Sequence, residues 1–319
     1  MRSKEAIVMN FALKYILKPI QTHMKIKPSS MRFVKKLIDM GSCIMAKVPD
    51  FISIKKVNAF GTAAEWIIPK DIADNNKVLL YMHGGGYFFS SPLSHRPITW
   101  RLSSKASVKV LSIDYRLLPD HTMCECWEDA IKSYKWLLDE GYKPENIVIA
   151  GDSAGAGLAL STLFQIKKSH LPQPAAAVCI SPFADISGSS TTLKTNARND
   201  HMFHVNAIHS LQAFLRESWD PKNAMISPVF GDYENLPPLF IQVSDTEMFY
   251  GDSICIREKA KKAGIEVKFS VWHNMPHAFT ILANFVPESK EAISEIASFV
   301  MDKLKIAYIK EGKINTSLS

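Results

Sequence analysis

Ser153 is the residue whose surroundings most strongly indicate chemistry, because it stands between two glycines in the stretch GDSAG (151–155). Residues 146–150 before it, apolar apart from Asn146, predict a buried strand, and residues 154–164 after it, which begin with small residues, predict a helix. On such a turn the glycines avoid clashes with neighbouring backbone, and the serine hydroxyl is lifted above the sheet at the positive end of the helix dipole. A glycine-rich phosphate loop or a plain tight turn would use similar residues. With a strand before it and a helix after it, the pattern predicts that Ser153 is a nucleophile.

A second glycine-rich stretch, HGGG at residues 83–86, also follows an expected buried strand. Glycines leave backbone N–H groups accessible, and such groups stabilise the oxyanion that forms when a serine attacks an acyl group. Each donor typically contributes about 3 kcal/mol to the transition state. We therefore predict an oxyanion hole made of three backbone N–H groups, those of Gly85, Gly86 and Ala154. His83 is expected to anchor the glycine loop rather than to act as a base.

A serine nucleophile needs a histidine base and an acid, which in this arrangement follow the serine with the acid first. Of the ten histidines, only His273 and His277 lie beyond position 209. His277 follows Pro276, which cannot continue the preceding strand, so the chain is expected to turn back over the sheet there. We predict that His277 is the general base and that His273 has a structural role.

Three carboxylates follow the expected strand 239–243 and are candidates for the acid: Asp245, Glu247 and Asp252. Asp252 is expected in the first turn of the next helix, where a carboxylate stabilises the helix dipole. The spacing does not decide between Asp245 and Glu247.

The elements that position these residues alternate along the chain. Short apolar runs predict strands at 77–82, 108–113, 146–150, 175–181, 239–243 and 267–272. Helical stretches lie between or after them, at 127–140, 158–168, 256–264 and 289–304. Before them, residues 57–68 predict a β-hairpin that turns at Gly61-Thr62. Strands that are apolar on both faces and separated by helices indicate a mostly parallel sheet covered on both sides. In such sheets reactive groups gather at the carboxyl ends of the strands.

Two regions depart from this alternation. The first 50 residues are expected to be helical, with helices at 4–20 and 31–47. Residues 184–236 separate two strands by far more than an ordinary crossover and include a helix-like stretch at 205–218. Long insertions of this kind are often lids or cap elements over a site.

The composition is that of an ordinary globular protein: 319 residues, of which 47% are hydrophobic and 22% charged. The net charge of +7 comes from lysines spread along the chain without interleaved aromatics, which argues against nucleic-acid binding. Five scattered cysteines favour free thiols in a reducing compartment, so a cytoplasmic location is predicted. Cys124 and Cys126 lack a second ligand pair at metal spacing, so no metal site is predicted.

Residues 6–17 are apolar enough to suggest the core of a signal peptide, but Asn10 and Lys14 interrupt them and no small-x-small cleavage site follows. The stretch is too short and too interrupted to span a bilayer. It fits an amphipathic helix whose lysines lie off the apolar side. Such a helix packs on the body of the protein or touches a membrane surface. The sequence leaves open a weak membrane-surface contact through residues 1–24, and also a homodimer.

Several blocks of the chain, in order, resemble the hormone-sensitive-lipase family of α/β-hydrolases, more narrowly its bacterial carboxylesterase and acetyl-hydrolase branch. The resemblance runs from about Val57 to about Leu304. The blocks are LLYMHGGGYFFSSPLSHR, SIDYRLLPD, IVIAGDSAGAGLAL, SPFADISGS, LPPLFIQVSDTEMFYGDS and VWHNMPHAF. Two departures stand out. The family's GDSAGG has Ala156 in its last place, and its DYRLAPEHPFPA block reads DYRLLPDHTMCECW. The second change weakens any transfer of substrate preference.

The resemblance implies an α/β-hydrolase fold with a mostly parallel central sheet, helices on both faces and a helical cap. It implies Glu247 as the acid, because glutamate fills that place in this branch. It also supports His277 as the base and the three predicted N–H donors as the oxyanion hole. The N-terminal helices and the 184–236 insertion would form the cap. The predicted regions are therefore an N-terminal helical cap region (1–50), a catalytic domain (51–305) with a cap insertion (about 184–236), and a C-terminal tail (306–319).

The predicted function is that of a serine carboxylesterase acting on short- to medium-chain acyl esters through an acyl-enzyme, without metal or organic cofactor. Five apolar residues are expected to line the pocket, with core packing as their alternative role: Tyr87, Phe88, Phe183, Met202 and Phe203. An amide, acetyl-group or lactone hydrolase with the same triad stays an alternative, as does an interfacial lipase. Gibberellin receptors resemble this family but have lost the catalytic histidine. Retention of serine, acid and histidine here argues against a purely binding role.

Overall fold

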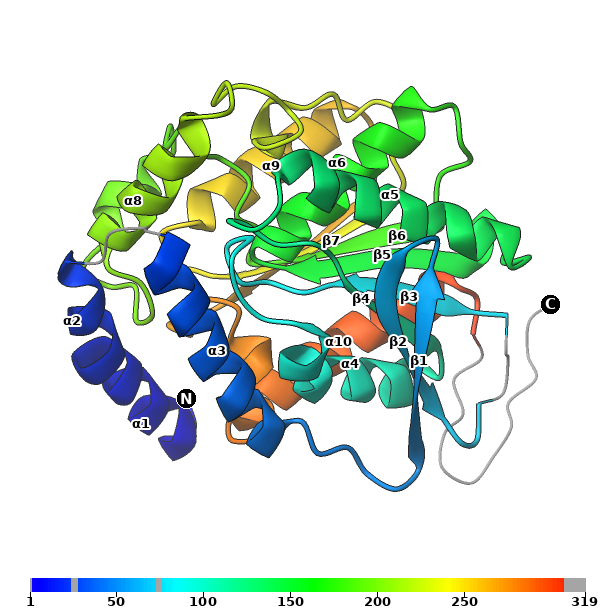
Figure 1. Ribbon diagram of the computed structural model, residues 1–319, viewed down its shortest axis with the longest axis horizontal. Helices are drawn as coiled ribbons and strands as arrows, with labels where there is room; N and C mark the ends of the chain where they lie inside the picture. Colours follow the sequence, from blue (N-terminus) through cyan, green and yellow to red (C-terminus); the bar gives the residue numbers. More distant parts are fainter. Residues whose placement is uncertain (1, 24–27, 73–75, 307–319) are drawn as a thin grey trace.

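The computed structural model of the chain describes residues 2–23, 28–72 and 76–306. Residues 1 and 24 of the predicted membrane-contact segment, and all of the predicted tail except Ile306, lie outside the described residues. The described chain forms one eight-stranded sheet with helices on both faces (Figure 1). The strand order is β1-β2-β4-β3-β5-β6-β7-β8. The predicted fold class is confirmed.

The sheet begins with an antiparallel hairpin and continues as a parallel sheet. The hairpin strands are β1 (Ile52–Ala59) and β2 (Thr62–Pro69), and β2 also pairs antiparallel with β4. The other strands all run parallel to their neighbours: β3 (Val78–Met82), β4 (Lys109–Asp114), β5 (Ile147–Asp152), β6 (Ala176–Ile180), β7 (Leu239–Ser244) and β8 (Val267–Trp272). Each of the six predicted parallel strands is present, with ends that differ by at most two residues.

The strand register brings the carboxyl ends of the parallel strands to one edge. Met82 of β3 is paired with Gly151 of β5. Ser244 of β7 is paired with Trp272 of β8. The loops that follow these four strands carry the HGGG stretch, Ser153, the candidate acids and the two late histidines. They therefore leave the sheet at the same edge, as parallel sheets require.

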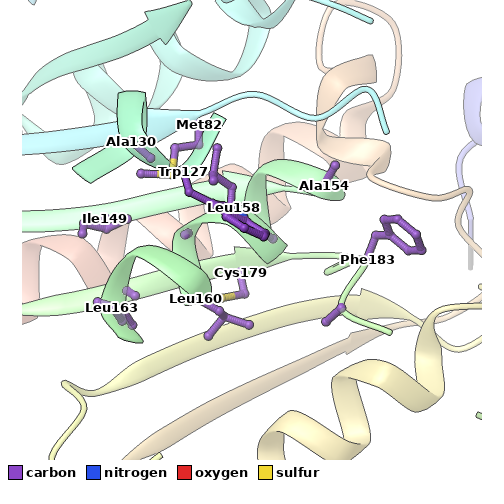
Figure 2. Close-up of a cluster of buried hydrophobic side chains, with 14 of the residues drawn as sticks. Met82, Trp127, Ala130, Ile149, Ala154, Leu158, Leu160, Leu163, Cys179 and Phe183 are labelled. Carbon is purple, nitrogen blue, oxygen red and sulfur yellow. The ribbon is translucent and has the colours of Figure 1, made fainter. Parts of the chain in front are cut away.

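Each face of the sheet is covered by its own hydrophobic cluster. On one face the helices are α5 (Met123–Asp139), α6 (Ala154–Lys168) and α9 (Tyr250–Lys262), and on the other α4 (Pro92–Ala106) and α10 (Pro287–Lys303). Figure 2 shows part of the first cluster, where Trp127 and Leu158 pack over the strands that carry Ile149 and Cys179. Fully burying one side chain of this size stabilises the fold by about 2 kcal/mol.

Helix α4 was not predicted from the sequence. Pro97 lies inside it, and proline in a helix interior normally argues against a helix because it removes a backbone donor. The helix is supported at its start by Ser91, which forms a capping box with Ser94, and by Pro92 in its first turn. Buried residues such as Ile98 and Leu102 then pack it onto the sheet. Tertiary packing therefore outweighs the local cost of Pro97.

The remaining helices gather beyond the carboxyl edge of the sheet. The N-terminal segment runs through α1 (Lys4–Ala12), a π-helical turn (Leu13–Leu17), α2 (Lys18–Ile20) and a 3-10 turn (Gln21–His23), and is followed by α3 (Pro28–Met45). The long insertion contains α7 (Thr192–Thr195) and α8 (Val205–Arg216). Figure 1 shows α1, α2, α3 and α8 together at one end of the molecule. None of the helices formed by the described residues is long and apolar enough to cross a membrane.

The prediction of free thiols is confirmed, because none of the five cysteines forms a disulfide. Cys124 is exposed and Cys126 is buried, and both belong to α5. This helix begins four residues earlier than predicted, because Thr122 and Glu125 form a capping box at its start.

Candidate active site

Ser153 occupies the sharp turn between β5 and α6. Its backbone has φ of 53° and ψ of −120°, a conformation that is strained for a residue with a side chain. A Cβ atom at Gly155 would overlap the carbonyl oxygens of Met82 and His83, so this position requires glycine. The turn therefore packs against the end of β3, the strand next to β5, and the serine side chain lies at the start of α6.

Three side chains from separate loops form a continuous hydrogen-bonded chain. The Oγ atom of Ser153 lies 2.7 Å from Nε2 of His277, and Nδ1 of His277 lies 2.6 Å from Oε2 of Glu247. The other carboxylate oxygen of Glu247 accepts hydrogen bonds from the backbone N–H of Ser244 at 2.7 Å and the hydroxyl of Ser181 at 2.8 Å. Both oxygens of the acid are thus engaged, which fixes the orientation of the imidazole.

The electrostatics of His277 suit a base that must take up a proton. Burial alone lowers its pKa, since a charged imidazolium loses hydration. The Glu247 carboxylate and its hydrogen bond outweigh burial, and the pKa of His277 is raised. At neutral pH the carboxylate can therefore stabilise the imidazolium that forms when the serine proton is transferred.

The structure separates the three candidate acids. Asp245 lies 2.6 Å from Nδ1 of His273, whose side chain is 82% exposed, and also accepts from the backbone N–H of Asn274. Asp252 is buried and accepts from the backbone N–H of Ala184. Burial and the nearby Asp185 raise its pKa well above the ordinary value. Neither Asp245 nor Asp252 contacts His277.

The glycine loop presents unused backbone donors to the space beside Ser153. Gly85 and Gly86 have φ of +119° and +63°, and neither N–H donates to an acceptor among the described residues. A Cβ at Gly85 would overlap the carbonyl oxygen of Phe89, so this tight turn also requires glycine. Ala154 is the first residue of α6, and its N–H therefore has no acceptor within the helix.

His83 holds the base of this loop. Burial and the neighbouring His95 lower the pKa of His83 to about 3, so its imidazole is neutral. Nδ1 of His83 lies 2.8 Å from the carbonyl oxygen of Gly84. Its ring stacks on that of Tyr115 at 4.4 Å, and the Tyr115 hydroxyl donates to the His83 carbonyl at 2.7 Å. These contacts suit the anchoring role expected from the sequence.

A second buried pair beneath the loop escaped the sequence analysis. Oδ1 of Asp152 accepts hydrogen bonds from the backbone N–H of Gly84 at 3.0 Å and from the hydroxyl of Tyr81 at 2.8 Å. Oδ2 of the same carboxylate lies 3.2 Å from Nε2 of His95 on α4. The signal was present in part, since an aspartate precedes the serine in GDSAG. His95 could not be placed beside it without helix α4.

A cavity of about 390 Å³ opens beside Ser153 and His277. Four of the five predicted pocket residues line it: Phe88, Phe183, Met202 and Phe203. Further apolar walls come from the N-terminal helices and α8, through Leu17, Ile20, Val34, Ile38, Ile208 and Leu211. Among the described residues no lysine or arginine lines the cavity. The space therefore suits a neutral, apolar group.

The expectation that Tyr87 lines the pocket is wrong. Tyr87 is 1% exposed and packs in the hydrophobic cluster beneath the sheet, with its hydroxyl beside Gly157 of α6. The backbone at this residue has φ of +68°, in the left-handed region. Neighbouring residues of a tight turn point in different directions, so Phe88 reaches the cavity whereas Tyr87 enters the core.

The N-terminal segment is joined to the cavity wall by a buried lysine. Nζ of Lys18 donates to the carbonyl oxygens of Ala197 at 2.7 Å and Asp200 at 2.6 Å. The Asp200 carboxylate in turn accepts hydrogen bonds from the backbone N–H groups of Met202 and Phe203. It also accepts one from the backbone N–H of Met248, the residue after Glu247. The sequence predicts that Lys18 lies off the apolar side of its helix, and in the structure it lies on the buried side, away from the exposed apolar residues. Within the described part of the chain, no group of three or more metal-ligating side chains is placed to hold a metal ion.

Comparisons with known proteins agree with this geometry. Residues 79–281 match a family described as "alpha/beta hydrolase fold". An acetyl-hydrolase of Streptomyces hygroscopicus is 35% identical over 237 residues, which are 74% of this chain and 79% of that protein. An esterase of Acinetobacter venetianus is 31% identical over 249 residues, which are 78% of this chain and 82% of that protein. The crystal structure of an esterase from the bacterial hormone-sensitive lipase family superimposes with a TM-score of 0.87 at 31% identity, and the match covers 95% of this chain and 99% of that one.

Proposed function

The chain belongs to the hormone-sensitive-lipase family of α/β-hydrolases and is a carboxylic ester hydrolase, and from this we propose that it cleaves short- to medium-chain acyl esters through a triad of Ser153, His277 and Glu247. The observation that carries the proposal is the buried contact of 2.7 Å between Ser153 Oγ and His277 Nε2. A serine hydroxyl at this distance from a neutral imidazole can lose its proton as it attacks a carbonyl carbon.

In the first half-reaction, Ser153 Oγ bonds to the ester carbonyl carbon while its proton passes to His277 Nε2. Glu247 holds the imidazole by its Nδ1–H and stabilises the resulting imidazolium. The negative charge on the carbonyl oxygen is stabilised by the backbone N–H groups of Gly85, Gly86 and Ala154. His277 then donates its proton to the alkoxy oxygen. The ester C–O bond breaks, the alcohol leaves, and the acyl group remains on Ser153.

In the second half-reaction, water attacks the acyl carbon while His277 removes a proton from it. The same N–H groups stabilise the second oxyanion. When this intermediate collapses, the bond to Ser153 Oγ breaks, His277 returns the proton to Oγ, and the carboxylic acid leaves. No step requires a metal ion or an organic cofactor.

The substrate range follows from the cavity. Its walls are almost entirely apolar, and no lysine or arginine among the described residues lines it to hold a charged substrate group. We propose that the N-terminal helical region 1–50 and the insertion 184–236 together form a cap, because both contribute side chains to this cavity, such as Ile38 and Leu211. A neutral acyl chain of short or medium length fits such a space. A homodimer and a cytoplasmic location stay predictions from the sequence, as does the weak membrane-surface contact through residues 1–24.

The test is hydrolysis of p-nitrophenyl esters from acetate to palmitate by the wild type and by Ser153→Ala. We expect activity on the shorter chains and a loss of about 10⁴- to 10⁶-fold in kcat for the variant. Ser169→Ala, on the exposed turn after the same helix, is the matched control and should keep full activity. If the wild type is no faster than Ser153→Ala on every ester, the ester proposal fails. Amide and lactone substrates would then be tested in the same pair.

A further inference from the structure

The N-terminal segment places most of its large apolar side chains toward solvent and two of its polar side chains toward the protein. On α1, the π-helical turn and α2, six large apolar side chains are each at least 50% exposed: Ile7, Val8, Phe11, Tyr15, Ile16 and Ile20. The buried side of the same segment includes Asn10, which is 4% exposed, and Lys18, which is 9% exposed. This orientation is the reverse of the one expected for a helix that packs on a protein core.

Specific hydrogen bonds fix this orientation. The Nδ2 atom of Asn10 donates to the carbonyl oxygen of Asn274 at 2.9 Å. The ammonium group of Lys18 donates to the carbonyl oxygens of Ala197 and Asp200. Rotating the helix to bury its apolar side would leave these polar groups without partners, at a considerable cost in free energy. In the native fold these hydrogen bonds therefore keep the apolar side of the segment exposed.

Helix α3 extends the exposed apolar area. Phe33, Leu37 and Met40 are 63%, 51% and 61% exposed, and their spacing places them on one side of the helix. We call these three residues and the six named above the N-terminal apolar surface. With Leu17 they make up ten of the fourteen large apolar side chains that are exposed among the described residues. Soluble proteins usually scatter such side chains, and a concentration of them marks an interaction surface.

This surface is continuous with the cavity beside Ser153. Leu17 and Ile20 line the cavity although they are 41% and 73% exposed. On α3, Val34 and Ile38, which lie before and after Leu37 in the helix, also line the cavity. An apolar molecule bound to the surface would therefore meet apolar side chains along the whole way to the cavity.

The positive charge of the same region indicates what kind of partner would bind the N-terminal apolar surface. Residues 1–45 contain nine lysines and arginines against two carboxylates, Glu5 and Asp39. Arg32 is paired with Asp120 and Lys35 with Asp39. Apart from the buried Lys18, the remaining described cations on these helices are Lys4 and Lys36, which are exposed, and Lys14, which is partly exposed. None of these three forms an ion pair with any residue that the structure describes. Apolar side chains surrounded by lysines fit an anionic lipid surface, which offers both a hydrocarbon layer and negative headgroups.

We propose that the N-terminal apolar surface docks on an anionic lipid surface, with the opening of the cavity facing the lipid. In this arrangement the N-terminal helices lie on the lipid surface and do not cross the lipid layer. Docking itself is independent of catalysis. A consequence that rests on the proposed function is that apolar esters dissolved in the lipid would reach Ser153 without passing through water.

The experiment uses the full-length Ser153→Ala protein, so that hydrolysis plays no part in it. Flotation is measured with vesicles of phosphatidylcholine alone and of phosphatidylcholine mixed with phosphatidylglycerol. We expect binding to the anionic vesicles that weakens as salt increases. Adding Val8→Ser, Phe11→Ser and Ile16→Ser should lower binding at least about tenfold, because three large side chains no longer enter the lipid. None of these three residues lines the cavity.

Matched controls distinguish binding through the N-terminal apolar surface from non-specific binding to vesicles. Phe60→Ser removes a side chain that is similarly exposed, 48%, but lies in the turn between β1 and β2, and should leave binding unchanged. Lys4→Gln, Lys14→Gln and Lys36→Gln together should weaken binding to anionic vesicles several-fold. With Ser153 restored, all these variants should hydrolyse p-nitrophenyl acetate at the wild-type rate, which shows that they fold.

Three results would overturn the proposal. The first is absence of binding to both kinds of vesicle. The second is an equal loss of binding for the Phe60→Ser control. The third is a dimer in sedimentation that the Val8, Phe11 and Ile16 substitutions convert to a monomer while vesicles are never bound, in which case the surface is covered by a second copy. Failure of the ester proposal would appear only with Ser153 present, so it cannot be confused with any of these.

Discussion

Asp152, the residue before the proposed nucleophile, is bonded directly to the glycine loop: its Oδ1 atom accepts a hydrogen bond of 3.0 Å from the backbone N–H of Gly84. The proposed oxyanion donors Gly85 and Gly86 follow immediately. This buried side chain therefore helps to set the position of these donors relative to Ser153. Burial raises the pKa of Asp152, but His95 and the hydrogen bonds to the carboxylate outweigh burial and leave its pKa lowered.

Asp152→Asn should therefore impair the oxyanion donors by shifting the glycine loop. An asparagine can still accept through one oxygen but brings an N–H₂ group against donors, so the glycine loop shifts. We expect kcat to fall about 10- to 100-fold, since one misplaced donor costs about that much, while KM changes little. Steady-state kinetics on a short ester measures the two separately. Asp232→Asn, which removes only an exposed ion pair with Lys167, is the control. An unchanged kcat would rule out this positioning role.

Glu247→Gln should alter both the rate and its dependence on pH. His277 must be neutral to accept the serine proton, so activity is lost as the pH falls through its pKa. The carboxylate raises that pKa, and the wild type should therefore lose activity at a higher pH than an ordinary histidine would give. In the variant the pKa falls, and the residual activity should persist to lower pH. We expect kcat to drop about 10²- to 10⁴-fold.

Asp245→Asn is the matched control for that experiment. Asp245 lies only two residues before Glu247, and the substitution removes the carboxylate that pairs with the exposed His273. It should change kcat by less than about twofold, as exposed ion pairs contribute little. A pH–rate profile of both variants decides the assignment. A large loss for Asp245→Asn with a small one for Glu247→Gln would exchange their roles.

Ile38→Trp should shorten the accepted acyl chain. Ile38 lines the cavity from α3, and a larger ring there fills space that a longer chain would occupy. We expect kcat/KM for octanoate esters to fall at least about tenfold relative to acetate, since each excluded methylene is worth about 1 kcal/mol. Leu37→Trp, the neighbouring residue on the exposed side, should leave the ratio unchanged on soluble esters. An equal effect of both variants would show that α3 does not form this wall.

Lys18→Met should loosen the N-terminal segment. The methionine keeps most of the length but leaves the carbonyl oxygens of Ala197 and Asp200 without their donor. Each buried group left unsatisfied costs about 1–3 kcal/mol. We expect faster hydrogen exchange over residues 4–20 and in the loop with Met202 and Phe203, together with a higher KM for longer chains. Lys4→Met, at an exposed position, is the control. Unchanged exchange at both places would contradict the anchoring role.

The sheet and most of the site loops could be predicted from the sequence because their signals are local. Strands such as 147–152 are apolar on both faces, and glycines flank Ser153 in the chain itself. The choice between Asp245 and Glu247 could not be made that way. The two differ by only two positions, and each meets a histidine about 30 residues further along the chain.

Other features depended on contacts that no local pattern contains. Pro97 concealed α4 and with it the contact between His95 and Asp152. The rotation of the N-terminal helix was left open by the sequence, which allowed either packing on the protein or contact with a membrane surface. The partners that fix it, Asn274 and the carbonyl of Asp200, lie more than 180 residues away in the sequence. Long-range polar contacts of this kind override hydrophobic periodicity.

The strand register described above also determines when activity can emerge during folding. Ser153 and His277 are 124 residues apart in the chain and meet only after β5, β6, β7 and β8 have paired side by side. Contacts this distant are costly in chain entropy and form late. During refolding from denaturant, helical signal from local segments such as α5 and α6 should therefore return before esterase activity does. Recovered turnover would report the completed sheet, and the interval between the two signals would measure how long the chain remains ordered but inactive.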